Sequence, residues 1–473
     1  MKGQRAMIIK PPPRNIRAGY DVADSGGSLA THWMGADNLS PDAAASQSVR
    51  RTMRSRARYE TQNNSYAKGI VSTLANYIIG TGPQLRLVPV GRDKSKATEE
   101  ILDDLSDAFD EWGDEIGLAK KLHTMQMSKA TDGEALGLLR NDSTTTRDIK
   151  LDFMPFETDF LDPGLMDIAT LGSTNPDGIV INKSGYPIAY NILQEHPGGG
   201  TMATSGKTKR VSAQYITQWF DVTRPGLHHG IPEISPALPM FAMLRRYTIA
   251  VVTGAETAAD FAAVMQSDAP ADSSGEEVVI DEGTMMEINR GMVTSLPKGW
   301  TLGQVKAENP TAQHEAFIRC MVREIGRSID MPYAVAAMDA SGHNYSSMRG
   351  DWQAFFQSIL VRRGLCGQQV LRKILSEFLQ ECAIVLGYGS ARNLPRFKAV
   401  WDWPDVMPLD PVKRAAARKI DLSIGAESYD EAYAKKGINP RQKKEEILKE
   451  SAFREMFFAS ATPKEDPKEE PKK

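Results

Sequence analysis

The chain has 473 residues, a net charge of −3 and a hydrophobic content of 41%. This is enough apolar material for a sizeable core, divided among roughly two to four compact units. The near balance between 57 basic and 60 acidic residues excludes a globally basic nucleic-acid-binding protein, although it leaves room for local basic patches.

The cysteines and the start of the chain indicate a compartment. Cys320, Cys366 and Cys382 are far apart in sequence and form no CxxC pair, so neither a disulfide scaffold nor a zinc ribbon is predicted. We expect buried free thiols in a reducing compartment. No apolar run is long enough to span a membrane, and the short apolar patch before "PPP" does not form a signal peptide. These features predict a soluble intracellular protein.

The first element along the chain is an arm over residues 1–45, which are rich in Gly, Ser, Pro and Ala and lack periodicity. Helical patterning begins near residue 46 and brings a crowd of arginines. Two interpretations remain open for this crowd: a solvated helix surface, or contact with an acidic partner or phosphates. The arginines are Arg50, Arg51, Arg54, Arg56 and Arg58.

Residues 60–232 alternate between helical and strand patterns. Ile70, Leu74 and Tyr77 share one helical face, and the glycines of "GTGP" end that helix. "LRLVPV" predicts a strand, two helices cover residues 96–116 and 119–133, and "EALGLLR", "IKLDFMPF" and "YITQWFDV" predict further strands. A hairpin over residues 178–193 turns at residues 183–185. This half is therefore predicted as mixed α+β.

Long helices dominate the second half. One is predicted from residue 238 to 265, entered through prolines, and short strands follow it. Helical periodicity returns over residues 312–329 and stops at "MPY". A loop of small and polar residues then precedes a very long helix over 347–386, with Gly364 and Gly367 as weak points. The last third is predicted helical to Phe458, before a charged, disordered tail. The fold class is α+β, mainly helical.

Signatures of catalysis were sought along the whole chain. "GGGTMATSGKTK" ends like a phosphate-binding loop, but five residues separate Gly200 from Gly206 and a strand pattern follows, so a flexible basic loop is favoured. His228–His229 is interpreted as surface loop, and the carboxylates of "DGE" and "DFLD" as turns and caps. No HExxH or GxSxG occurs. We predict no catalytic residue, no cofactor and no metal site.

One charged pattern carries more information. Arg319, Arg323 and Arg327 are four residues apart, so they share one face of the predicted helix, and Glu315 precedes Arg319 by four. The pattern fits a solvated, salt-bridged face. It also fits a subunit contact or a charged lining that repeats around a ring, where a modest charge per subunit becomes a strong field.

The order of these pieces resembles the lambda-type family of tailed-bacteriophage portal proteins. Five blocks carry the resemblance over about residues 60–450: "NNSYAKGIVSTLANYIIGTGPQL", "GIVINKSGYPIAYNILQEHPGG", "FDVTRPGLHHGIPEISPALPMFAMLRRY", "IDMPYAVAAMDASGHNYSSMRGDWQAF" and "WPDVMPLDPVKRAAARKIDLSIGAES". The fourth is the most similar, with Met-Pro-Tyr followed by Asn-Tyr-Ser-Ser.

The resemblance implies an architecture. It assigns residues 1–45 to a flexible arm, 46–232 to the wing, 233–266 to a first stem helix, 267–309 to the clip and 310–330 to a second stem helix. Residues 331–346 would be the tunnel loop, 347–400 a long wing helix, 401–458 the crown helices and 459–473 a disordered tail.

It also implies a function. Such proteins are non-enzymatic rings, usually of twelve subunits, at one capsid vertex of the virion, assembled in the host cytoplasm. Double-stranded DNA would pass without sequence preference, and the expected partners are the terminase large subunit, the major capsid protein and head-completion or connector proteins, with no membrane. The stripe Arg319, Arg323 and Arg327 would be a stem or subunit contact. The terminase-docking clip would carry four acids: Glu276, Glu277, Asp281 and Glu282.

The tunnel loop would face DNA through Ala340, Ser341, Gly342, His343, Asn344 and Tyr345. No Lys or Arg occurs from Asp330 through Met348, so contact with phosphates would be weak, as a conduit requires. Gly342 would let the loop bend. The alternatives are another packaging protein, such as a terminase or nuclease, and a different capsid or tail adaptor.

Overall fold

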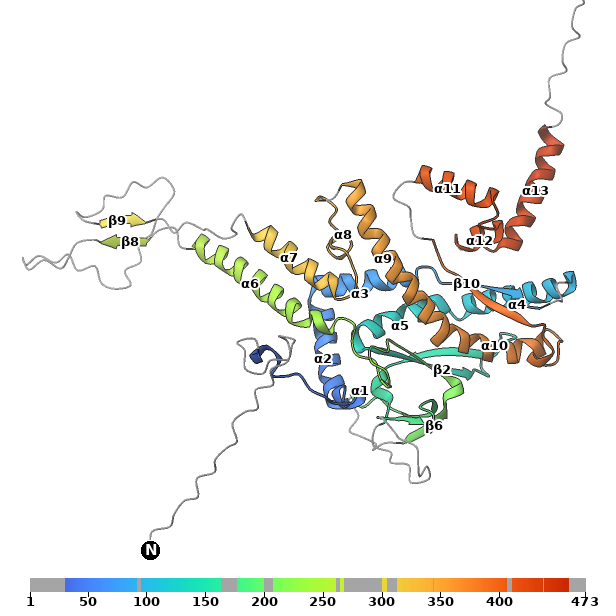
Figure 1. Ribbon diagram of the computed structural model, residues 1–473, viewed down its shortest axis with the longest axis horizontal. Helices are drawn as coiled ribbons and strands as arrows, with labels where there is room; N and C mark the ends of the chain where they lie inside the picture. Colours follow the sequence, from blue (N-terminus) through green and yellow to red (C-terminus); the bar gives the residue numbers. More distant parts are fainter. Residues whose placement is uncertain are drawn as a thin grey trace, which may run out of the picture.

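The fold is an α+β body from which a long two-helix arm projects (Figure 1). The computed structural model describes residues 30–91, 95–162, 177–199, 207–260, 264–267, 300–303, 313–342, 344–405, 411–436 and 438–458. The predicted clip acids Glu276, Glu277, Asp281 and Glu282, and His343 of the predicted tunnel loop, lie outside these ranges.

Five helices open the body, and their ends follow local capping rules. Ser40 caps the first helix by accepting from the Ala43 amide, and Asn64 caps the third by accepting from the amides of Tyr66 and Ala67. Gly80 ends that third helix region with a φ of +57°, as the glycine pattern predicts. The five are α1 (Pro41–Ala44), α2 (Gln47–Asn63), α3 (Ser65–Ile78), α4 (Lys96–Glu115) and α5 (Leu118–Asp132).

The strands form four small antiparallel sheets, in the orders β1-β10, β3-β2-β7, β4-β5-β6 and β8-β9. The predicted hairpin at residues 183–185 is confirmed, with Gly185 at a φ of +84°. The strand bounds are β1 (Gln84–Pro89), β2 (Glu134–Asn141), β3 (Leu151–Phe156), β4 (Ile179–Ile181), β5 (Pro187–Leu193), β6 (Thr208–Ser212), β7 (Ile216–Phe220), β8 (Val264–Ser267), β9 (Trp300–Gly303) and β10 (Phe397–Asp402).

The projecting arm consists of α6 (Leu238–Asp260) and α7 (His314–Arg327), which lie side by side with β8 and β9 beyond their outer ends (Figure 1). The prediction of helix to residue 265 is wrong at its end, because Val264–Ser267 pairs as a strand with Trp300–Gly303. Residues beyond Ala263 can satisfy their backbone groups against β9, and a strand ladder replaces the helical one.

The long helix after the loop is confirmed, with a change of pitch near the predicted weak point. It comprises α9 (Tyr345–Cys366), a π-helical turn over Gly367–Leu371 and α10 (Arg372–Val385). The π turn begins at Gly367, whose missing side chain lets Trp401 approach: a Cβ there would lie 3.2 Å from Trp401 Cδ1. A glycine therefore marks the point where β10 packs against the helix.

The strand β10 contradicts the prediction of helix throughout the last third. Its residues alternate, with Phe397, Ala399 and Trp401 on the face that packs against the core, and it pairs with β1, more than 300 residues earlier in the chain. Three helices follow it: α11 (Pro411–Ser423), α12 (Tyr429–Ala434) and α13 (Pro440–Phe458).

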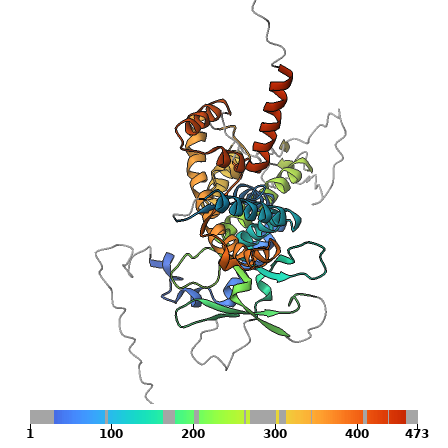
Figure 2. The same ribbon diagram turned by 90° about the vertical axis from the view of Figure 1, so that its right-hand side faces the viewer.

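The main core lies between α3, α4, α5 and the α9–α10 rod. Phe109 and Trp112 of α4 each place their rings 5.1 Å from the ring of Phe378 on α10. Cys366 and Cys382 are buried in this core, as expected for free thiols, but Cys320 on α7 is exposed, so the expectation of burial is wrong there. Figure 2 shows the body from the side, with the green strands of the β4-β5-β6 sheet below the teal helices α4 and α5.

Candidate functional site

The segment between α7 and α9 consists of a buried half and an exposed half. Met331 is buried, and residues Tyr333–Ala336 form a short helix, α8, whose Ala334 and Val335 are also buried. The predicted loop over 331–346 is therefore helical in its first part, because its apolar residues reach the core. The chain enters and leaves α8 through Asp330 and Met338, at φ of +59° and +53°. Two non-glycine residues in this costly conformation indicate that packing fixes the segment.

Tyr333 connects α8 to the predicted arginine stripe. The guanidinium carbons of Arg319 and Arg323 each lie 5.6 Å from the centre of its ring. Its hydroxyl donates a 3.0 Å hydrogen bond to Asp339 Oδ2. Burial is the main cause that raises the pKa of Tyr333, and this hydrogen bond raises it further. Arg319 and Arg323 therefore fix the side chain of Tyr333, which in turn is hydrogen-bonded to Asp339 at the start of the loop.

The exposed half begins at Met338. Ala340, Ser341, Gly342, Asn344 and Tyr345 are all exposed. Asp339 accepts from the Ser341 amide, and Asn344 caps α9 through a reciprocal capping box with Ser347. Ordered turns thus shape the loop that the resemblance assigns to the tunnel.

Two cationic side chains from other elements, Arg319 and Lys413, approach this loop, although the loop itself contains no Lys or Arg. Arg319 Nη1 lies 3.0 Å from where a Cβ on Gly342 would be, and the Lys413 ammonium lies 5.3 Å from the centre of the Tyr345 ring. Gly342 does not have a positive φ, so its role here is to admit Arg319 rather than to adopt a left-handed turn. The positions of Arg319 behind Gly342 and of Lys413 beside Tyr345 were not predicted.

The third arginine of the stripe faces outward. Arg327 has 83% of its side chain exposed and pairs with Asp330 at 2.9 Å, while Arg319 pairs with Glu315 at 2.5 Å. Arg323 and Arg327 line a cavity of about 390 Å³ that reaches Pro332 and Asp351 at the start of α9. The arginine stripe therefore forms ion pairs within the chain and also lines an open cavity with charged side chains.

Packing between aromatic rings holds the two arm helices together. Tyr247 of α6 stacks on His314 of α7 at 5.4 Å and meets Phe317 edge-on at 4.7 Å, and its hydroxyl forms a 3.0 Å hydrogen bond with His314 Nδ1. The arm is thus a paired rod and not two separate helices.

A buried charge cluster anchors the root of the arm. Glu233, just before α6, forms ion pairs with Lys129 of α5 and Arg362 of α9, and the Lys129 and Glu233 side chains are 1% and 7% exposed. These two cations offset the burial of the Glu233 carboxylate and lower its pKa to about 2. The cluster therefore ties α5 and α9 to the residue just before α6.

The arginine crowd of α2 is turned inward at three of its five members. Arg50 bonds Asp177 at 2.6 Å, Arg54 bonds Asp159 at 2.6 Å, and Arg58 holds Asp132 through two 2.7 Å bonds. Arg51 and Arg56 are exposed. The interpretation of this segment as a solvated helix surface is therefore wrong for Arg50, Arg54 and Arg58, whose acidic partners lie in the same chain.

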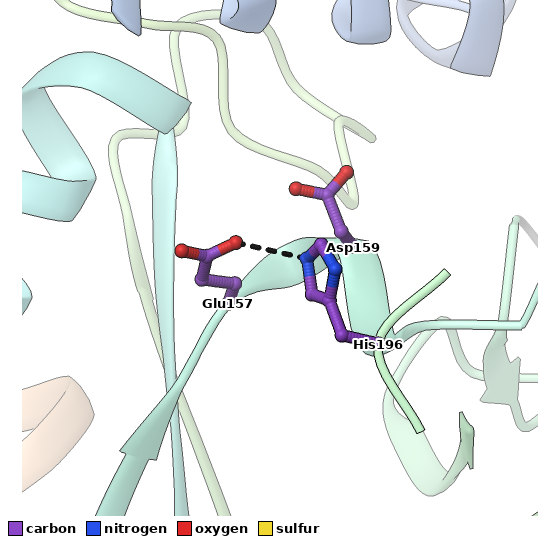
Figure 3. Close-up of side chains that lie close together, drawn as sticks. All are labelled: Glu157, Asp159 and His196. Atoms are coloured by element: carbon purple, nitrogen blue, oxygen red, sulfur yellow. Dashed lines mark hydrogen bonds and ion pairs between the residues drawn. The ribbon is translucent and has the colours of Figure 1, made fainter. Parts of the chain in front are cut away.

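One cluster has the residue types of a metal site. Glu157, Asp159 and His196 have ligand atoms within 4.8 Å of one another, and Figure 3 shows the 3.1 Å contact between Glu157 Oε2 and His196 Nε2. Arg58 also contacts Glu157 at 3.3 Å and Asp159 at 2.8 Å. These guanidinium contacts already balance the carboxylates that a cation would need, so the cluster is an extension of the α2 network.

The histidine pair is not a simple surface loop. His229 is 1% exposed, and its Nδ1 lies 2.9 Å from Glu134 Oε1, which is fully buried beside Gln218. His228 contacts Asp42 of α1 at 2.7 Å, so part of the predicted flexible arm is held against the body. The expectation of surface is wrong for His229 because a buried carboxylate from β2 pairs with it.

Comparison with known proteins decides the family. The family described as phage portal protein, lambda family, matches residues 26–363. The chain belongs to this family. A probable portal protein of Halomonas phage phiHAP-1 is 24% identical to it over 443 residues, which are 87% of this chain and 82% of that protein.

Solved structures give further similarities to this portal protein. A virion of a native gene transfer agent particle contains a chain 14% identical, with a TM-score of 0.42, covering 82% of this chain and 93% of that one. An HK97 family phage portal protein from Corynebacterium diphtheriae is 12% identical, with a TM-score of 0.30, covering 63% and 85%.

The resemblance found in the sequence is therefore confirmed: the protein functions as a phage portal protein, a structural component of the phage particle. Among the described residues, no helix is long and apolar enough to cross a membrane.

Proposed function

We propose that copies of this chain close into a ring of twelve at one capsid vertex, and that double-stranded DNA passes through the ring during packaging and ejection. The chain acts without catalytic turnover. Membership of the portal family supports this proposal. The ring would assemble in the host cytoplasm. Its partners would be the terminase large subunit, the major capsid protein and head-completion or connector proteins.

The observation that carries the channel assignment is the exposed loop over residues 338–345. Among its described residues, 338, 340–342, 344 and 345 are exposed. The loop leaves the body between α8 and α9, is fixed at both ends, and contains no Lys or Arg. Two cations that approach it are engaged, Arg319 with Glu315 and Lys413 with the Tyr345 ring. Such a surface touches DNA without gripping it, because affinity for phosphates rises with each charge neutralised.

The other parts are assigned by their place along the arm. The paired rod of α6 and α7 serves as the stem, and the stretch of chain between them, which holds Glu276, Glu277, Asp281 and Glu282, serves as the clip that receives the terminase. The stripe of Arg319, Arg323 and Arg327 meets a neighbouring copy through the cavity beside Asp351.

The test is to remove residues 340–343 from the full chain, which leaves the Asn344 cap of α9 in place. Because the loop ends are fixed independently by Tyr333 and by the Asn344–Ser347 cap region, we expect the ring to assemble while DNA packaging or retention fails. The matched control replaces residues 340–343 with Gly and Ser at unchanged length and should package more DNA than the deletion.

Four results would contradict the proposal. Normal packaging by the deletion would remove the loop from the channel, and negative-stain images of monomers or small dimers would remove the ring. Copies spread throughout the shell would favour an adaptor. Metal-dependent DNA cleavage by the pure protein, lost on chelation, would favour a nuclease.

A further inference from the structure

The two outer edges of the sheet formed by β1 and β10 differ in whether their backbone groups are hydrogen-bonded to other parts of the chain. The Val90 amide donates to the Arg396 carbonyl at 2.9 Å, and the register pairs Val88 with Lys398 and Arg86 with Val400. Backbone groups alternate in direction along an antiparallel pair. The amides and carbonyls of the intervening residues therefore point away from the partner strand: Leu85 and Leu87 on β1, and Phe397, Ala399 and Trp401 on β10.

On the β1 side, α4 covers the outward edge. The Leu85 amide donates to Asp110 Oδ1 at 3.1 Å, and the Leu87 amide donates to Ser106 Oγ at 3.2 Å. Side chains of a packed helix thus satisfy the backbone donors that the sheet leaves over, as buried amides require.

On the β10 side, nothing in the described part of the chain does the same. No hydrogen bond from the described residues reaches the backbone of Phe397, Ala399 or Trp401. A strand with an open row of alternating donors and acceptors is a template for one more strand.

A groove runs along this open edge. Its cavity of about 760 Å³ lies between the α9–α10 rod and β10, close to the π-helical turn. Gly364 faces open space, so the rod does not fill the groove at that point. The apolar walls come from Leu375 and Leu379 of α10 and from Phe397, Trp401 and Trp403.

The charges of the groove are all of one sign. Arg363, Arg372 and Lys398 line it, and no Asp or Glu does. The Arg363 guanidinium already donates hydrogen bonds to the carbonyls of Tyr77 and Ile78. Arg372 and Lys398, in contrast, are exposed. A ligand that enters the groove therefore meets apolar walls and two available cations.

We propose that this groove binds an extended acidic segment of another protein, which pairs with β10 as a third strand of the sheet. Alternate residues of the segment would pack on Trp401 and Phe397, and its carboxylates would meet Arg372 and Lys398. The proposal does not depend on ring formation.

An extended polypeptide fits the edge better than the alternatives. Single-stranded nucleic acid could stack on the tryptophan and meet the cations, but its phosphates would face the carbonyls of Phe397, Ala399 and Trp401 without a donor to offer. A helix has no free backbone groups along its length to pair with a strand.

The chain's own ends are also poor occupants. Residues 1–29 carry five Lys and Arg against two Asp, a charge that Arg372 and Lys398 repel. The tail over residues 459–473 carries four acids and four lysines, and a proline at every fourth position (Pro463, Pro467 and Pro471) removes backbone donors.

The test uses the full chain and synthetic peptides of about eight residues, enough to span the six residues of β10. One peptide alternates Glu and Val, a second alternates Lys and Val, and a third is the acidic peptide with every backbone amide methylated. Fluorescence anisotropy should show binding of the first alone, because only it carries both the charge and the backbone donors.

Variants locate the site. Ala399→Pro removes one outward amide without touching the ladder to β1 and should weaken binding about tenfold, the value of one good hydrogen bond. Ala399→Thr keeps that amide and should bind as the parent does. Combined Lys398→Glu and Arg372→Glu should also weaken binding by about tenfold or more. Circular dichroism and thermal unfolding check that each variant is folded.

Several outcomes would overturn the proposal. They are equal binding of the acidic and basic peptides, binding of the methylated peptide, failure of the acidic peptide to bind, and insensitivity to Ala399→Pro. Binding of oligothymidylate that the same variants abolish would assign the groove to nucleic acid. Loss of ring assembly in folded Ala399→Pro would show that a second copy covers the edge.

Discussion

Two helices of this protein carry the same arginine pattern with opposite results. In α2 the residues are Arg50, Arg54 and Arg58, and in α7 they are Arg319, Arg323 and Arg327, each set at four-residue spacing. The α2 set turns inward onto carboxylates from distant parts of the chain. In the α7 set, Arg319 and Arg323 stack on Tyr333 and Arg327 faces solvent. Spacing defines a helix face but not what covers it.

The energetic consequence follows from burial. Arg50 and Arg54 are 3% and 7% exposed, so each guanidinium is held by its carboxylate largely out of contact with water. Arg327, at 83% side-chain exposure, already exchanges its partner with water. The α2 set is therefore part of the fold, and the α7 set is available for contacts between copies.

The largest expected effect comes from the same substitution at the centre of each set. Arg54→Met should lower the free energy of unfolding by about 2 kcal/mol, because Asp159 loses one largely buried charged hydrogen bond and keeps only its contact with Arg58. Arg323→Met should cost less than about 1 kcal/mol, since it loses only a stacking contact. Urea unfolding of the two variants measures the difference directly, and equal losses would contradict the comparison.

A second effect depends on pH. Burial raises the pKa of Asp132, and the two bonds from Arg58 offset part of that rise. Neighbouring Arg54 also lowers this pKa, and Glu157 raises it. In Arg58→Met the main offset is lost, so the pKa of Asp132 in the folded state rises further above its unfolded value.

The sign follows from proton binding. A carboxyl with a raised folded pKa holds its proton more tightly when folded, so its contribution is present at low pH and is lost as the pH rises through that folded pKa. Arg58→Met should therefore be destabilised more at pH 8 than at pH 5, by about 1.4 kcal/mol for each unit of added shift. Parallel stability profiles with Arg56→Met, an exposed neighbour on the same helix, provide the control.

A third prediction concerns assembly. Arg323→Glu should weaken ring formation about tenfold, or about 1.4 kcal/mol, while the isolated chain stays folded. The reason is that reversal places a negative charge beside Asp330 and Asp351 at the cavity that we assign to a neighbouring copy. Arg349→Glu makes the same charge change on exposed α9 and should assemble normally. An unchanged oligomer in Arg323→Glu would leave the stripe as solvated surface.

Local signals predicted much of the fold. The apolar spacing of Ile70 and Leu74 and the glycines after them defined α3, and the turn at residues 183–185 defined its hairpin, because both depend on neighbours in sequence. Strand β10 was missed because its partner β1 lies more than 300 residues away. The inward turn of Arg54 was missed for the same reason, since Asp159 is over 100 residues distant.

The composition of the loop could be read from the sequence, whereas the contacts that support the loop could not, and its role in a tunnel stays a prediction. The absence of Lys and Arg from the loop is visible in the sequence, and Ala340, Ser341, Gly342, Asn344 and Tyr345 are exposed. The clamp of Arg319 and Arg323 on Tyr333 was not predicted, because the contact depends on the left-handed turn at Asp330 that brings α8 back against α7. Aspartate in that conformation leaves no strong local signal.

The smallest expected effect is at the outer end of the α7 set. Arg327→Gln should change the free energy of unfolding by less than about 0.5 kcal/mol, because the Arg327–Asp330 pair is exposed on both sides. Any loss should vanish in 1 M salt, where the screening length is about 3 Å. Arg54→Met should keep most of its loss under that condition, since its ion pair is shielded from solvent. A salt-resistant loss above about 1 kcal/mol in Arg327→Gln would mean that the pair is buried in the assembled protein, and the two arginine sets would then be alike.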